Sequence, residues 1–127
     1  LKNQLGQNQS LAQLTAHIRK NLDPKIPLWL EVDTLDQFCE ALPFGGADII
    51  LLDNFSLTDM QKAVVLRNQW NTKNPNATIP LLEASGGITL ATIPAIAAIG
   101  VDRISIGALT HSAPILDLSM EFQSRDS

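Results

Sequence analysis

Residues 47–55 read ADIILLDNF and carry a strong signal for the type of sheet in this chain. Four consecutive branched apolar residues at 49–52 predict a strand that is covered on both faces, which is typical of a parallel sheet. The run ends in Asp53, a charged side chain that needs a partner or a ligand beside so apolar a segment. In parallel α/β folds the carboxyl ends of the strands carry the chemistry. The stretch therefore predicts a functional site at its C-terminal end.

Three other apolar runs end in the same way, in a carboxylate or a glycine. They are 28–30 before Glu31, 79–82 before Glu83 and Ser85-Gly86-Gly87, and 103–106 before Gly107. The spacing between successive run ends fits one β-α-β crossover each. Parallel strands are therefore predicted at 28–32, 49–52, 79–82 and 103–106, with their C-terminal ends on one rim.

The segments between these strands predict helices, because they carry capping signals or apolar stripes. The predicted helices cover 11–22 after an N-cap at Ser10, 35–43 after a Thr34/Gln37 capping box, 57–71 after a Ser56/Asp59 box, and 90–98 before Gly100. The tail at 110–121 predicts only a short packed segment.

Alternating strands and helices predict an α/β fold built from parallel β-α repeats. Four parallel strands do not close a barrel, and an open sheet of four would leave apolar edges exposed. The chain is then either a small doubly wound sheet or part of a larger TIM-like α/β barrel. Because the chain starts abruptly and without Met, we expect the second: residues 1–127 form the C-terminal part of a barrel catalytic domain, with an N-terminal domain and the first barrel strands outside them.

Composition excludes several classes of protein. The 127 residues have 45% hydrophobic and 17% charged content, which is typical of a globular domain. A net charge of −4 without basic clusters argues against a nucleic-acid partner. No apolar run reaches the roughly 20 residues of a membrane helix. The lone Cys39 excludes an intrachain disulfide, and we expect it to be a buried, inert thiol.

The rim residues predict an enzyme that acts on a phosphorylated sugar. Glu31 and Asp53 can bind two ribose hydroxyls directly or through Mg²⁺, although a lone carboxylate there can also simply mark where a strand meets water. The glycine turns after Ser85 and at Gly107 would bring backbone N–H groups to a phosphate. His111 can contact that phosphate or act as a polar cap of the C-terminal segment.

Positive charge is scarce for such a site. Of the basic residues, only Lys2 is a candidate for a place at the strand ends, so most of the positive charge would come from Mg²⁺ or from residues outside this chain. Trp29 and Trp70 are predicted to be packing residues.

Four segments resemble the quinolinate phosphoribosyltransferase family, also called carboxylating nicotinate-nucleotide pyrophosphorylases. They are Glu31 to Leu35 (EVDTL), Gly46 to Phe55 (GADIILLDNF), Leu82 to Thr89 (LEASGGIT) and Gly107 to Ser112 (GALTHS), in the family's order and close to its spacing. The resemblance covers almost the whole chain.

The resemblance implies phosphoribosyl transfer from phosphoribosyl pyrophosphate to quinolinate with decarboxylation. The products would be nicotinate mononucleotide, pyrophosphate and CO₂, in NAD biosynthesis, in a cytoplasmic homodimer with Mg²⁺. It also implies that Glu31 and Asp53 bind the ribose hydroxyls and the metal, that the backbone at Ser85, Gly86 and Gly107 binds the 5-phosphate, and that Lys2 helps to bind the anionic substrates.

The chain also departs from the family pattern. The family usually has Lys-Asp-Asn-His where this chain has Lys2-Asn3-Gln4-Leu5, and a glutamate where this chain has Trp29. Because the quinolinate-binding cations are missing, we expect the 127 residues alone to be inactive. Two alternatives are a related phosphate-binding barrel homologue with another base, such as one associated with molybdenum transport, and a non-catalytic fragment or paralogue.

Overall fold

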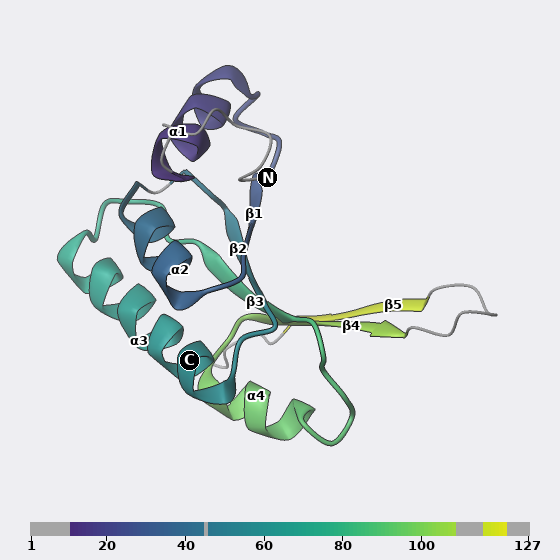
Figure 1. Ribbon diagram of the computed structural model, residues 1–127. Coiled ribbons are helices and arrows are strands. Elements are labelled where there is room, and N and C mark those ends of the chain that lie inside the picture. The colour runs from purple at the N-terminus through teal and green to yellow at the C-terminus, as the bar shows by residue number, and fades with distance from the viewer. Residues whose placement is uncertain (1–10, 45, 109–115, 122–127) are drawn as a thin grey trace, which may run out of the picture.

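The computed structural model describes residues 11–44, 46–108 and 116–121 as one α/β unit (Figure 1). Its elements, in chain order, are α1 (Leu11–Asn21), β1 (Trp29–Val32), α2 (Leu35–Ala41), a 3-10 turn η1 (Leu42–Phe44), β2 (Ile49–Asp53), α3 (Leu57–Lys73), β3 (Leu81–Ser85), α4 (Ile93–Ile99), β4 (Arg103–Ala108) and β5 (Leu116–Glu121). The four predicted parallel strands and the four predicted helices are all present.

The sheet has the strand order β1-β2-β3-β4-β5. The pairs from β1 to β4 are parallel, and β5 is antiparallel to β4. Each helix contacts the next one along the chain, and α1 to α4 lie on one side of the sheet in Figure 1. A doubly wound sheet would reverse its strand order and place helices on both faces. The observed order is that of a barrel segment, in which each crossover moves one strand further in the same direction.

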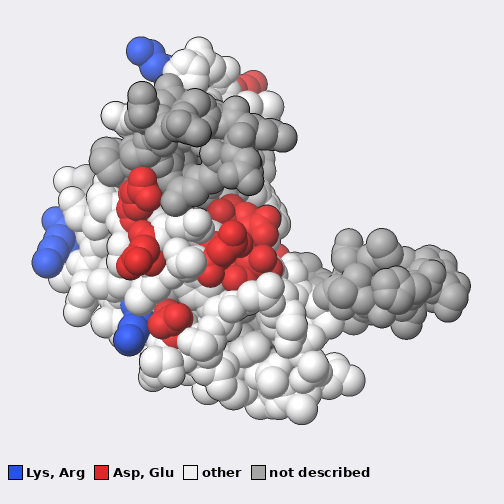
Figure 2. All heavy atoms as spheres, in the orientation of Figure 1, with Lys and Arg blue, Asp and Glu red and all other residues white. Residues whose placement is uncertain are grey.

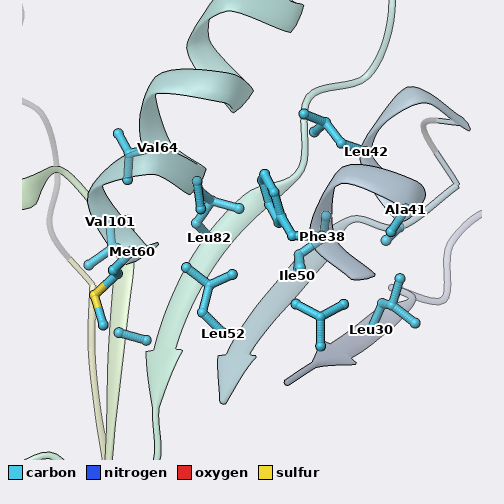
Figure 3. Packing of buried hydrophobic residues seen from close by; sticks show 14 of the residues in the cluster. Leu30, Phe38, Ala41, Leu42, Ile50, Leu52, Met60, Val64, Leu82 and Val101 are labelled. Atoms are coloured by element: carbon cyan, nitrogen blue, oxygen red, sulfur yellow. The ribbon is translucent and has the colours of Figure 1, made fainter. Parts of the chain in front are cut away.

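The core lies between the helices and one face of the sheet (Figure 3). Leu30, Ile50, Leu52 and Leu82 point from the strands toward Phe38 on α2, while residues of α3 close the other end. Side chains alternate along a strand, so the neighbours of these residues point the other way. We call that second side the helix-free face, since no described helix covers it. It is lined by Trp29, Glu31, Leu51, Asp53, Glu83, Ser85, Arg103 and Ser105.

The predicted strand at 79–82 was misplaced. The strand β3 runs from Leu81 to Ser85, so Glu83 lies inside it and not at its end. Pro80 has no N–H to donate to a ladder, and pairing with β2 begins only at Leu81, which is opposite Ile49. Because the strand shifts toward the C-terminus, Ser85 becomes its last residue and is opposite Asp53.

The tail, where a short packed segment was predicted, contains β5, which pairs with β4, while residues 109–115 lie outside the described part. Two smaller expectations were wrong. The helix predicted at 90–98 begins at Ile93, next to Pro94 in its first turn. Cys39 is exposed on α2, so it is not a buried thiol. Both predicted helix starts carry the N-cap bond of a capping box: Thr34 accepts from the backbone N–H of Gln37, and Ser56 accepts from that of Asp59.

Two Arg–Asp pairs tie the helices to the N-terminal ends of the strands. Arg67 of α3 is 8% exposed and lies 2.6 Å from Asp102, which also accepts from the backbone N–H of Leu82 at 2.8 Å. In the same way Arg19 of α1 is paired with Asp48, which accepts from the N–H of Leu28 at 2.7 Å. Each aspartate precedes a strand and bonds to the neighbouring strand segment, so each pair fixes a strand register.

We expect Arg67→Ala to lower the free energy of unfolding by about 3 kcal/mol, because it leaves a partly buried carboxylate without its cation. Urea denaturation followed by circular dichroism measures this change. The matched control is Lys62→Ala, which removes an exposed cation from the same helix and should change stability by less than about 0.5 kcal/mol. Equal effects of the two substitutions would show that the Arg67–Asp102 pair does not hold the fold.

Candidate functional site

Three carboxylates meet at the C-terminal ends of β1 and β2. Glu31 lies near the end of β1, Asp33 follows that strand, and Asp53 is the last residue of β2. One carboxylate oxygen from each lies within 4.8 Å of the others. We call these residues the acid cluster. Figure 2 shows Asp and Glu side chains gathered in a patch near the middle of the visible surface. The sequence predicted two members, Glu31 and Asp53, and missed Asp33.

The backbone around Asp33 explains why it joins the cluster. Its N–H donates to the side-chain oxygen of Gln37 at 2.7 Å, and Thr34 caps α2. These two bonds fix the turn that leads from β1 into α2. The signal in the sequence was the spacing Glu31-Val32-Asp33, since residues two apart point to the same side of an extended chain.

The glycine turn after β3 lies against the acid cluster. The hydroxyl of Ser85 donates to Asp53 Oδ1 at 3.5 Å, and the backbone N–H of Asn54 donates to the Ser85 carbonyl at 3.0 Å. Gly86 has a φ of +78°, and a Cβ placed there would lie 2.6 Å from Asp53 Oδ1. Only glycine fits so close to the carboxylate. The acids of the first two strands and the turn after the third therefore share one rim.

The remaining predicted site residues are placed as follows. Gly107 lies on β4, opposite Asp117 of β5. Lys2 and His111 lie outside the described residues. The helix α4 begins six residues after Gly87, so the N–H groups next to Ser85 belong to the turn and not to the first turn of a helix. The roles assigned to these residues in phosphate binding stay predictions.

The surroundings of Glu31 raise the pKa of its carboxyl group. Partial burial raises its pKa above the ordinary value, and the charge of Asp53, a hydrogen bond to Asp53 and the charge of Asp33 raise it further. A cation placed among these oxygens would relieve the repulsion. Carboxylate oxygens are ligands of hard divalent cations such as Mg²⁺.

A second polar group on the helix-free face was not foreseen. Glu83 of β3 is 2% exposed, and its Oε1 accepts a hydrogen bond from the Ser105 hydroxyl of β4. Its Oε2 is buried and has no hydrogen-bond partner among the described residues. Burial raises the pKa of Glu83, while the charge of Arg103 lowers it. Sequence reasoning treated Glu83 as a strand end because the strand was placed two residues too early.

Trp29 differs from its predicted role as a packing residue, and it meets Arg103, to which no role was assigned. The Arg103 Cζ lies 5.7 Å from the centre of the Trp29 ring, so the guanidinium of β4 reaches the indole of β1. Trp29 is 48% exposed and is therefore not a buried packing residue. Trp70, on α3, is half-buried and packs against the core as predicted. Because Arg103 begins a strand, it was not considered among the residues at the strand ends.

The fold and the rim define a class: a segment of a TIM-like α/β barrel whose strand ends carry a carboxylate cluster and a glycine turn. Residues 2–121 match the family model described as quinolinate phosphoribosyl transferase, C-terminal domain. The chain belongs to this family, as the four motifs predicted.

Curated relatives carry the same description. The chain is 40% identical over 98 residues to the carboxylating nicotinate-nucleotide pyrophosphorylase of Mycobacterium leprae, covering 77% of this chain and 32% of that protein. It is 35% identical over 109 residues to the human enzyme, covering 85% and 34%. The chain thus spans about a third of the length of these relatives.

A solved structure agrees with the fold. The nicotinate-nucleotide pyrophosphorylase of Francisella tularensis matches with a TM-score of 0.68 and 30% identity, over 94% of this chain and 40% of that one. The expected α/β fold of parallel repeats, as part of a TIM-like barrel, is confirmed. No helix of the described part is long and apolar enough to cross a membrane.

We expect Gly86→Ala to displace Asp53 and to destabilise the protein by about 1–2 kcal/mol, because the new methyl group meets the carboxylate and the backbone keeps a left-handed φ. Gly87→Ala is the matched control. It has a similar φ of +64°, but its Cβ would come no closer than 3.4 Å to Asn54 Oδ1. Thermal unfolding of both variants separates the clash from the backbone strain; equal losses would mean that the closeness to Asp53 costs nothing.

We expect Glu31→Gln to stabilise the protein at neutral pH. A pKa that is raised in the folded state means that the folded chain holds this proton more tightly than the unfolded chain, so ionisation of Glu31 disfavours folding. The advantage of Gln should vanish as the pH falls below the ordinary glutamate pKa, where Glu31 is protonated in both states. Urea denaturation between pH 4 and about 8 measures this. A variant that is less stable at pH 7 would contradict the repulsion.

Proposed function

We propose that this chain forms the ribose- and phosphate-binding part of a quinolinate phosphoribosyltransferase. The reaction is the transfer of the phosphoribosyl group from phosphoribosyl pyrophosphate to quinolinate with loss of CO₂. It yields nicotinate mononucleotide and pyrophosphate, for NAD biosynthesis. One observation carries the proposal: Ser85 and Gly86 touch the same Asp53 that joins Glu31 and Asp33.

The acid cluster suits the ribose. Carboxylate oxygens accept hydrogen bonds from vicinal hydroxyls, and Glu31 and Asp53 offer oxygens from two adjacent strands. Positive charge develops at the anomeric carbon as pyrophosphate leaves. Fixed negative charge nearby stabilises that state more than the ground state, which is the general condition for catalysis.

The turn suits a phosphate. The left-handed conformations of Gly86 and Gly87 let the backbone come close to a ligand without a side chain between them. The Ser85 hydroxyl is held beside Asp53, so it would lie between the sugar and the phosphate parts of the proposed site. Gly107 on the next strand would extend the same rim.

The donor set also fits Mg²⁺. Glu31, Asp33 and Asp53 would hold the ion, since their oxygens lie close enough to share one hard cation. When bound, the ion supplies positive charge that offsets the charge of the leaving pyrophosphate.

Several parts of the whole protein stay predictions. They include a cytoplasmic location, a homodimer, and the N-terminal domain and further barrel strands that would carry cations for quinolinate. Support for them comes from the family resemblance. The 127 residues alone are expected to bind ribose phosphate without turning over.

We expect Glu31→Gln and Asp53→Asn, in the full-length protein, each to weaken Mg²⁺-dependent binding of phosphoribosyl pyrophosphate by about tenfold or more, which is about 1.4 kcal/mol. Isothermal titration calorimetry with and without Mg²⁺ measures the affinity. The matched control is Asp36→Asn, which removes an exposed carboxylate from the first turn of α2 and should bind like the wild type.

Three results discriminate the alternatives. Loss of binding in both site variants together with quinolinate-dependent release of CO₂ supports the proposal. Binding that is lost in the variants while quinolinate is not consumed points to a homologue with another base. Binding that is equal in wild type and variants points to a non-catalytic paralogue and overturns the proposal.

A further inference from the structure

Asn54 follows β2 with a backbone conformation that few residues adopt. Among the described residues it is the one other than glycine with a positive φ, at +56°. Side chains in this left-handed region cost free energy, and such residues gather at functional sites, where the surrounding structure holds them. Neither the acid cluster nor the turn residues assigned to the phosphate include Asn54. Its conformation therefore needs a reason of its own.

The left-handed backbone turns the Asn54 side chain toward the glycine turn. Consecutive residues of a strand point to opposite faces. Asn54 Oδ1 and Asp53 Oδ1 nevertheless lie 2.7 Å and 2.6 Å from one point, the position that a Cβ on Gly86 would take. The amide of Asn54 thus lies on the same side as the carboxylate of Asp53 and against the backbone of Gly86.

The backbone of Asn54 is tied to the same turn. Its N–H donates to the Ser85 carbonyl at 3.0 Å, one residue beyond the last pair of β2 and β3. The side-chain amide also extends toward Gly87, since Asn54 Oδ1 is 3.4 Å from the position of a Cβ there. Backbone and side chain of Asn54 therefore both lie against the turn.

We propose that Asn54 is a positioning residue of the phosphate site. Its backbone and amide hold the turn of Ser85, Gly86 and Gly87 in the shape that the ligand meets, and its lack of charge separates the acid cluster from the phosphate. This inference rests on the proposed function and deepens it, because it adds to that site a residue that acts through the turn.

The lack of charge at position 54 matters because the acid cluster is so close. Asp53, one of the three acids, precedes Asn54 in the chain and meets the same point at Gly86. Aspartate matches asparagine in shape and also tolerates a left-handed backbone. A carboxylate at position 54 would therefore fit, but it would be a fourth acid, and it would repel a phosphate at the turn more strongly than in bulk water. An amide gives the same packing without this repulsion.

Two substitutions separate the amide from the backbone and the charge from the shape. Asn54→Gly keeps the left-handed φ and the N–H bond to Ser85 but removes the amide. Asn54→Asp keeps the shape and adds the charge. Asn76→Asp is the matched control, because it makes the same chemical change at an exposed residue before β3, at the other end of the strands.

The test is steady-state kinetics of the full-length protein with phosphoribosyl pyrophosphate and quinolinate varied separately. Asn54→Gly should raise KM for phosphoribosyl pyrophosphate by about threefold or more, because the turn loses its support, and Asn54→Asp by about tenfold or more, because a charge is added as well. KM for quinolinate should change by less than about twofold in both variants, and Asn76→Asp should change neither constant.

Three kinetic results would overturn the inference. If Asn54→Gly keeps the wild-type KM for phosphoribosyl pyrophosphate, the amide does not position the turn. If it raises both KM values equally, the loss is one of general structure. If Asn54→Asp raises KM no more than Asn54→Gly does, the charge at this position has no effect on the phosphate.

Calorimetry with ribose 5-phosphate separates this inference from the proposed function, since that ligand carries the sugar and the phosphate without pyrophosphate or quinolinate. If its affinity falls from wild type to Asn54→Gly to Asn54→Asp while quinolinate is not consumed, the inference stands and the proposed reaction fails. If turnover is present and both variants keep the wild-type affinity and KM, the inference is overturned and the reaction stands. A wild type that neither binds ribose 5-phosphate nor turns over overturns both.

Discussion

Two Arg–Asp pairs at the N-terminal ends of the strands fix the register of the parallel sheet. Asp48 and Asp102 each bind an arginine from the helix that precedes them by one repeat and a backbone N–H of the neighbouring strand segment. Because side chains alternate along a strand, a slip of one residue would turn every polar group of the helix-free face into the core. The pairs therefore determine that Asp53 meets Glu31 and Ser85 at the opposite end.

The stabilising ion pairs and the candidate site therefore lie at opposite ends of the strands. The tying interactions lie before β2 and β4, whereas strained and repelling groups lie after β1, β2 and β3. Asn54 and Gly86 both have positive φ, and partial burial together with the neighbouring Asp53 and Asp33 raises the pKa of Glu31. Such features cost free energy and persist where the surrounding structure fixes them. In α/β barrels, ligands bind at the C-terminal ends of the strands, which is where these unfavourable features lie.

Most helices and strands could be predicted from the sequence, because the local capping signals agreed with the regular spacing of the apolar runs. Four apolar runs with regular spacing gave the strands, and the Thr34 and Ser56 caps gave two helix starts within a residue. Asp53 and Gly86 were found because a charge after an apolar run and a glycine after a strand are both conspicuous. Periodicity could not place β3 correctly, since Ile79 and Pro80 look like strand residues, whereas pairing with β2 begins only at Leu81, after the proline that has no N–H to donate.

The sequence did not predict those contacts that depend on which face of the sheet a residue occupies. Trp29, Glu83 and Arg103 lie on three strands, and nothing in their local sequence shows that the sheet brings the first and last of them into contact. Once the register is known, β1 to β4 place four carboxylates of the described side chains on this face, in the acid cluster and Glu83, with the guanidinium of Arg103 among them. A polyanionic substrate is repelled by that balance until a divalent cation offsets the acid cluster.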